Sequence, residues 1–129
     1  MGKVVSMFRI GGVTHKVKYV DNILDPYNNR ILYGTHNPTT GIITVAKELG
    51  DLSISEDMQK LTFYHELGHA FLNAMNWRFD EKNQEEDFAE RLGRVMLEYE
   101  QTKELVDERD LQTTKGSKVR RVPKTNKKL

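Results

Sequence analysis

Cysteine is absent from this chain of 129 residues. The protein therefore has no disulfide framework and no zinc site built from thiolates, so any metal must be bound through nitrogen and oxygen atoms. Long apolar runs are also missing, since no stretch approaches the roughly 18 residues of a membrane span. The N-terminal sequence MGKVVSMFRI lacks the apolar stretch and small-residue cleavage site of a signal peptide. We expect an intracellular, cytoplasmic protein with no membrane partner.

Charge is distributed unevenly along the chain. The 20 Lys and Arg residues nearly balance the 19 Asp and Glu residues, which gives a net charge of +1. Seven of the basic residues lie between Lys115 and Leu129, where there is no acidic residue, so the rest of the chain is acidic. We predict one soluble domain over residues 1–110 and a basic, disordered tail over residues 111–129. Nucleic acid would contact the protein only through this tail.

The first half of the chain has the pattern of β-strands. Val4–Ile10 and Val13–Val20 are rich in β-branched residues, and Gly11-Gly12 between them indicates a two-residue hairpin. A second hairpin is predicted from Ile31–Gly34 and Ile42–Ala46, with its turn at residues 36–41. These elements predict a small, mostly antiparallel sheet.

The second half changes to helical spacing. Ser53 and Glu56 have the spacing of a capping box, and apolar residues then recur every three or four positions as far as Asn76. After a turn, a second helix is predicted from about Asn83 past Glu100. We expect its apolar seam at Phe88, Leu92, Val95 and Tyr99.

The segment His65-Glu66-Leu67-Gly68-His69 lies inside the first predicted helix. It matches HExxH, the pattern of zinc-dependent hydrolases. Positions i and i+4 of a helix lie side by side, so both imidazoles can reach one ion. Glu66 follows the first histidine and would take a proton from water activated by the metal.

Two histidines leave a catalytic zinc site one protein ligand short. The second helix offers four carboxylates, those of Glu85, Glu86, Asp87 and Glu90. If the two helices are antiparallel, the helical rise returns residue 86 to the level of His69, which favours Glu86 as the ligand and leaves Glu85 as the alternative. Glu90 would orient a ligating histidine through its free ring nitrogen.

Several of these side chains also have an ordinary structural explanation. Glu86 has the spacing of a capping-box partner for Asn83, and Glu90 would otherwise be a solvated residue. Gly68 and Gly93 would let the helices approach closely. The remaining polar candidates are expected to be core or surface residues, with His15 in the core, His36 in an exposed turn, and Tyr33 and Tyr64 in either place.

These residues resemble the zincin metallopeptidases of the gluzincin type, in which HExxH on one helix is joined by a glutamate from the next. They look most like small phage and prophage proteins related to the ImmA/IrrE metallopeptidases. The resemblance covers roughly Ile31 to Leu97 and includes TFYHELGHAFLNAM and EEDFAERLG. It implies that His65, His69 and Glu86 are metal ligands, that Glu66 is the catalytic base and that Glu90 supports a ligand. For a phage-encoded protein, the compartment would be the host cytoplasm.

The leading hypothesis is therefore a zinc metallopeptidase, a hydrolase that uses Zn²⁺ and a zinc-activated water to cut a peptide bond in a protein or peptide substrate. Strand Ile42–Ala46, as a sheet edge, would align that substrate by β-addition. The alternative is a non-catalytic zincin-fold binding protein of phage origin that acts on a regulator and touches nucleic acid through its tail. Both share one expected fold, an α+β zincin-like domain whose small sheet packs on the HExxH helix and a following antiparallel helix.

Overall fold

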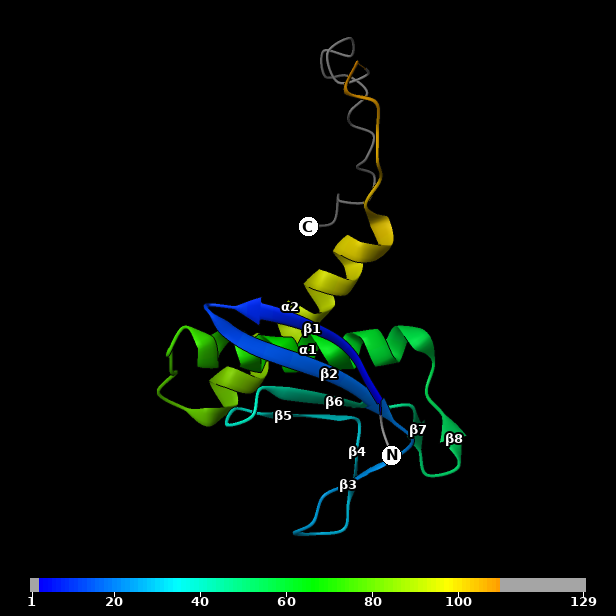
Figure 1. Ribbon diagram of the computed structural model, residues 1–129, viewed down its shortest axis with the longest axis vertical. Coiled ribbons are helices and arrows are strands. Elements are labelled where there is room, and N and C mark those ends of the chain that lie inside the picture. The colour runs from blue at the N-terminus through cyan, green and yellow to red at the C-terminus, as the bar shows by residue number, and fades with distance from the viewer. Residues whose placement is uncertain (1–2, 110–129) are drawn as a thin grey trace.

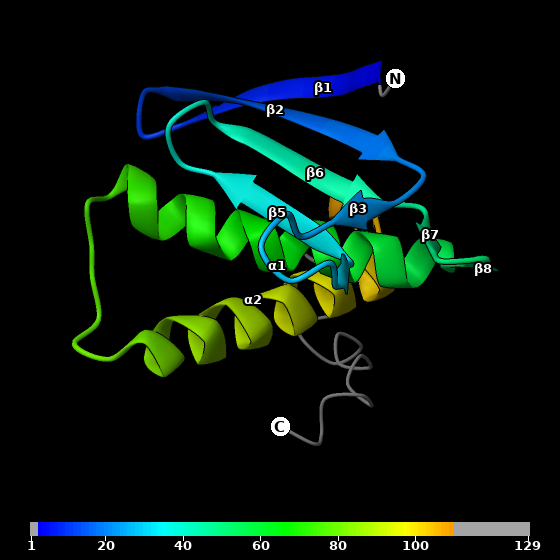
Figure 2. The ribbon, with the colours of Figure 1, turned by 90° about the horizontal axis from the view of Figure 1, so that it is seen from below.

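The computed structural model describes residues 3–109, so the predicted basic tail lies outside the described part of the chain (Figure 1). The elements run from strands β1 to β8 into two helices, α1 (Glu56–Ala74) and α2 (Lys82–Thr102). Figure 2 shows the main sheet as one layer, with α1 against it and α2 beyond α1. The α+β class is confirmed. Neither helix is long and apolar enough to cross a membrane.

The main sheet has four strands in the order β1-β2-β6-β5. Its first two strands, β1 (Lys3–Ile10) and β2 (Val13–Val20), form the predicted antiparallel hairpin. Gly11 and Gly12 close it with φ angles of 58° and 81°, which favour glycine. The third strand, β6 (Ile42–Ala46), pairs with β2 in parallel, so the sheet is mixed, although its other two pairings are antiparallel as predicted.

The second predicted hairpin is shifted along the chain. Strand β5 (Gly34–Asn37) runs antiparallel to β6. The turn covers residues 38–41, so it is shorter than the predicted 36–41, and His36 and Asn37 belong to the strand. Ile31–Leu32 forms the separate strand β4 and pairs with β3 (Ile23–Leu24). This small ribbon closes because the Asp25 N–H donates to the Arg30 carbonyl at 2.8 Å and the Asn29 N–H to the Asp25 carbonyl at 2.9 Å. A second ribbon joins β7 (Glu48–Leu49) to β8 (Leu52–Ser53).

The edge of the sheet beside the candidate site is β5. The prediction that Ile42–Ala46 is an edge strand is wrong, because β6 lies between β2 and β5. The chain leaves β2 through the β3–β4 ribbon and enters β5 at the outside of the sheet, and the turn after Asn37 then carries it inward to β6. Within the described residues β5 pairs on one side only, with β6.

The core lies between the sheet and α1. Its buried members include one residue of β2, alternate along β6 and recur at helical spacing on α1, namely Val17, Ile43, Val45, Leu67 and Ala70. Period-two alternation puts the strand residues on one face, and the three-residue step from 67 to 70 keeps both helix residues on the facing side. This packing fixes the orientation of α1, so the opposite side of that helix is presented to α2.

Local signals define the N-terminus of each helix, although not all of these signals are the predicted ones. The cap of α1 is Ser55, whose Oγ accepts from the Met58 N–H at 3.2 Å, whereas the predicted cap Ser53 belongs to β8. For α2, the Gln84 side chain accepts from the Glu81 N–H at 3.2 Å. The capping alternative for Glu86 with Asn83 is therefore wrong.

The two helices run antiparallel and approach closely, as predicted. A Cβ added at Gly68 would lie 3.0 Å from Ala89 Cα, and one added at Gly93 would lie 3.3 Å from the His65 backbone nitrogen. The face of α2 that meets α1 therefore contains the small residues Ala89 and Gly93. The predicted apolar seam is wrong at its C-terminal end, because Val95 and Tyr99 are exposed.

Candidate metal centre

The two histidines of HExxH lie on the side of α1 that faces α2. Their ring centroids are 5.2 Å apart, as expected for residues one helical turn apart. Gly93 lies against the backbone of His65, and Gly68 lies against Ala89. The absence of side chains at these two positions brings the acidic first turns of α2 within reach of both imidazoles.

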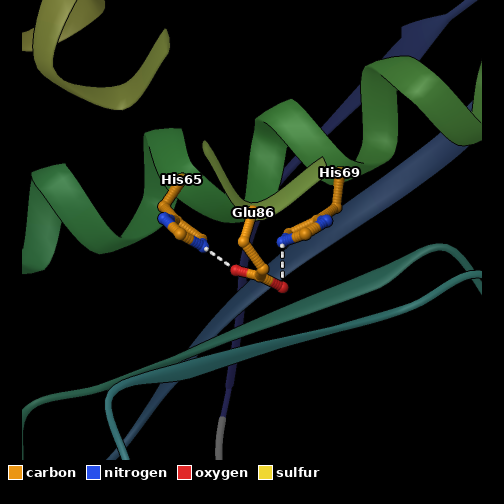
Figure 3. Close-up of side chains that lie close together, drawn as sticks. All are labelled: His65, His69 and Glu86. Carbon is orange, nitrogen blue, oxygen red and sulfur yellow. Dashed lines mark hydrogen bonds and ion pairs between the residues drawn. The ribbon is translucent and has the colours of Figure 1, made fainter. Parts of the chain in front are cut away.

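Glu86 lies between the two imidazoles, as Figure 3 shows. Its Oε1 is 3.3 Å from His65 Nε2, and its Oε2 is 3.4 Å from His69 Nε2. Each of the three residues offers one ligand atom, and these three atoms lie within 4.8 Å of one another. The structure therefore brings together the three predicted metal ligands.

The second ring nitrogen of each histidine faces another carboxylate. His69 Nδ1 is 2.7 Å from Glu85 Oε2, and His65 Nδ1 is 3.4 Å from Glu90 Oε1. An imidazole that donates from Nδ1 to a carboxylate keeps its lone pair on Nε2, which is the arrangement of a metal-ligating histidine. Both Nε2 atoms here face Glu86, so the three side chains converge on one point from two helices.

The spacing of these atoms can be compared with that around a zinc ion. Two ligand atoms held tetrahedrally at zinc distances lie about 3.3–3.6 Å apart. Each Nε2 atom lies 3.3 or 3.4 Å from one oxygen of Glu86, but the two oxygens differ, and one ligand atom per residue gives a set within 4.8 Å. Small side-chain rotations would therefore have to draw the three ligand atoms together around an ion. The donor set of two imidazoles and one carboxylate also suits zinc in a chain without cysteine. Glu85 is occupied at His69 Nδ1, so the geometry favours Glu86 for the third position.

Glu66 is held in an environment that disfavours its charge. Burial raises the pKa of its carboxyl above the ordinary 4.5, and the Glu86 carboxylate raises it further, while His69 and His65 act in the opposite direction. Gly34 on β5 lies directly over this side chain, since a Cβ there would be 3.4 Å from Glu66 Cγ. A largely desolvated carboxylate beside a ligand cluster is suited to accept a proton.

A cavity of about 370 Å³ opens beside the cluster. One part of its wall contains the carboxylates of Glu66, Glu85 and Glu86 together with His69. The other parts come from β5 and its turn, from the chain between the helices and from the first residue of α2. They include His36, Pro38, Trp77, Arg78 and Lys82. The cavity is large enough to admit a peptide side chain.

His36 lies in β5 and lines the cavity, so its prediction as an exposed turn residue is wrong. Burial lowers the pKa of its imidazole below 6.5, and His15 and His69 lower it further. His15 is fully buried, as predicted, and its ring stacks on Phe8 at a centroid distance of 5.4 Å. The His15 and His36 rings are 5.9 Å apart. His36 is therefore a half-buried side chain of the cavity wall, in surroundings that disfavour its charged form.

Neither Tyr33 nor Tyr64 lines the cavity. The Tyr64 hydroxyl donates to Glu100 Oε1 at 2.5 Å, and burial together with this contact raises its pKa to about 12. Lys60 also binds Glu100, at 2.7 Å, so this cluster ties α1 to the far part of α2. Tyr33 is 45% exposed. Trp77, Arg78 and Lys82 were not predicted as site residues, because only the helix pairing shows that the inter-helix turn borders the cavity.

The chain matches no known family model, no curated protein and no solved structure.

Proposed function

We propose that this protein is a zinc-dependent metallopeptidase related to the ImmA/IrrE type of zincin. The observation that supports it best is the convergence of His65, His69 and Glu86, with a further carboxylate at each remaining imidazole nitrogen. Two helices that merely pack together would need only one or two of these histidine–carboxylate contacts. The set found here has the composition that a ligand shell and its orienting carboxylates would need.

Each side chain would have a distinct task. His65, His69 and Glu86 would hold Zn²⁺, while Glu85 and Glu90 would keep the two imidazoles in the tautomer that binds metal through Nε2. Zinc bound there supplies Lewis acidity, which acidifies water and polarises a peptide carbonyl.

Glu66 would accept the proton of the attacking water and pass it to the leaving amine. Two properties of this residue support the role. Its carboxyl lines the same cavity as His69 and Glu86, and its raised pKa makes it a stronger base than an ordinary glutamate. The positively charged metal would lower that pKa and keep the group ionised near neutral pH.

An extended peptide would bind along β5. This strand has an unpaired side within the described residues, and its His36 lines the cavity that also contains Glu66. Backbone hydrogen bonds to an edge strand hold a substrate in an extended form without requiring a particular sequence. The substrate strand proposed here is therefore β5, in place of the interior strand β6.

The test uses purified full-length protein loaded with zinc and a digest-derived peptide library, with cleavage followed by mass spectrometry. Glu66→Gln should retain one zinc per chain and lose cleavage by at least about 100-fold, since general base catalysis contributes about that much. Glu108→Gln, a change of the same kind far along the chain, is the control. Cleavage at the wild-type rate by Glu66→Gln would refute the proposal.

A further inference from the structure

The wall of the cavity also contains two cations. Arg78 lies in the connection between the helices, and Lys82 is the first residue of α2. Within residues 3–109, neither has a carboxylate within the 4.0 Å of an ion pair. Lys82 is three residues before Glu85 and four before Glu86 on the same helix, a spacing that often gives a pair, yet it pairs with neither.

The position of this cationic wall is fixed by the end of α1. Asn76 adopts a left-handed conformation with φ of 57°. The Trp77 N–H donates to the Leu72 carbonyl at 2.9 Å and the Asn76 N–H to the Asn73 carbonyl at 3.1 Å, which is the Schellman motif. This closure ends the helix and starts the connection in one direction. Trp77 and Arg78 therefore emerge at the cavity rather than along the helix axis.

Charge balance indicates what the cavity lacks. With neutral imidazoles, the wall contains the three carboxylates of Glu66, Glu85 and Glu86 and the two cations. Addition of a divalent ion leaves one net positive charge beside a desolvated site. A single anionic group placed against Arg78 and Lys82 would neutralise this positive charge. The exposed Trp77 indole would then cover the aliphatic part of the side chain that carries the anionic group.

We propose that this cavity is a specificity site for an acidic side chain, so that the protein acts on peptides with a glutamate or aspartate next to the bond that is cut. The inference rests on the proposed zinc peptidase function. Arg78 would determine specificity by a forked contact with the carboxylate, and Lys82 would add a second positive charge. A lysine or arginine side chain would meet two like charges in the same place.

Two matched probes test this without requiring catalysis. Both are short peptide hydroxamates, which bind zinc, and they differ only in carrying a glutamate or an isosteric glutamine side chain. Calorimetry on the zinc-loaded full chain should show the glutamate probe binding about three- to tenfold more tightly, the range expected for two largely exposed charge contacts. Higher salt should reduce the difference.

Variants assign the preference to the cavity. R78A/K82A should lower the ratio of the two affinities to about one, and R78E/K82E should reverse it, while zinc content stays at one per chain. The control R30A/K103A removes an arginine and a lysine that do not line the cavity and should keep the wild-type ratio. Equal binding of the probes by zinc-loaded wild type, or a preference that survives in R78A/K82A, would overturn the proposal. A chain that binds no zinc would refute the metal centre itself, which is a separate and earlier result.

Discussion

Gly34 is the position at which a single methyl group tests the packing of β5 on α1. An alanine Cβ there would lie 2.5 Å from Thr62 Cγ2 and 3.1 Å from the Thr44 carbonyl oxygen. Carbon atoms in favourable contact are about 3.5–4.0 Å apart, so the Cβ–Cγ2 contact is too short by about 1 Å. Thr62 is only 8% exposed and is β-branched, so it has little freedom to rotate away. Gly34→Ala must therefore push β5 off the helix.

The expected loss of stability follows from two opposing terms. Overpacking of this kind costs about 1–3 kcal/mol, while replacement of a strand glycine by alanine contributes about 0.5–1 kcal/mol in the other direction. We expect the free energy of unfolding of metal-free Gly34→Ala, measured by urea denaturation, to fall by about 1–2 kcal/mol.

Thr62→Ser provides the matched control because it removes the methyl group that Cβ would strike. Combined with Gly34→Ala, it should recover about half of the loss, giving a coupling energy of about 0.5–1 kcal/mol in a double-mutant cycle. A Gly34→Ala protein as stable as wild type would refute the close packing of β5 on α1. So would an effect of Thr62→Ser that is the same in both backgrounds.

Three further predictions concern the site. Glu85→Gln and Glu90→Gln should each weaken zinc binding about 10- to 100-fold in a chelator competition, because each removes the partner of an imidazole Nδ1, and wild-type affinity in both would contradict this role. The folded state raises the pKa of Glu66, so its contribution to stability is present below the ordinary value of 4.5 and is lost as pH rises through the folded pKa. Metal-free Glu66→Gln should thus unfold at higher urea than wild type at pH 7. This gap should narrow as pH falls through the folded pKa of Glu66 and close below about 4.5. A gap that does not change with pH would argue against a desolvated carboxylate. The folded state lowers the pKa of His36 below 6.5, so its contribution to stability is present above pH 6.5 and is lost as pH falls through the folded pKa. In metal-free protein, His36→Gln should therefore reduce the fall in unfolding free energy between neutral and acidic pH. The same pH dependence in wild type and His36→Gln would place His36 in solvent.

The sequence was most informative where one short-range signal determines the outcome. Period-two alternation and Gly11-Gly12 predicted the first hairpin, and the three- and four-residue spacings predicted both helices. Helical rise alone placed Glu86 level with His69, because two antiparallel helices joined by a short turn have little freedom in register. Gly68 and Gly93 were interpretable for the same reason.

The sequence misled where several local signals compete or where tertiary pairing decides. Ser53 has the capping-box spacing to Glu56, but Ser53 pairs with Glu48 in the β7–β8 ribbon, which leaves Ser55 as the cap. Ile31–Leu32 has strand character, but the closed Asp25–Arg30 turn draws it to β3. The interior position of β6 depends on its parallel pairing with β2, which no local pattern encodes. The place of Arg78 and Lys82 in the cavity wall likewise depends on tertiary structure, because it results from the pairing of α1 with α2.

The central claim is that His65, His69 and Glu86 hold one zinc ion, and metal analysis of variants tests it most directly. After loading and dialysis, wild type should contain one zinc per chain. His65→Ala and Glu86→Ala should contain close to none, whereas Glu85→Ala should still fill to one zinc at higher free zinc, since Glu85 faces His69 Nδ1 and not the shared centre. Full zinc occupancy of Glu86→Ala with wild-type affinity, or wild-type protein that binds no zinc, would contradict the account.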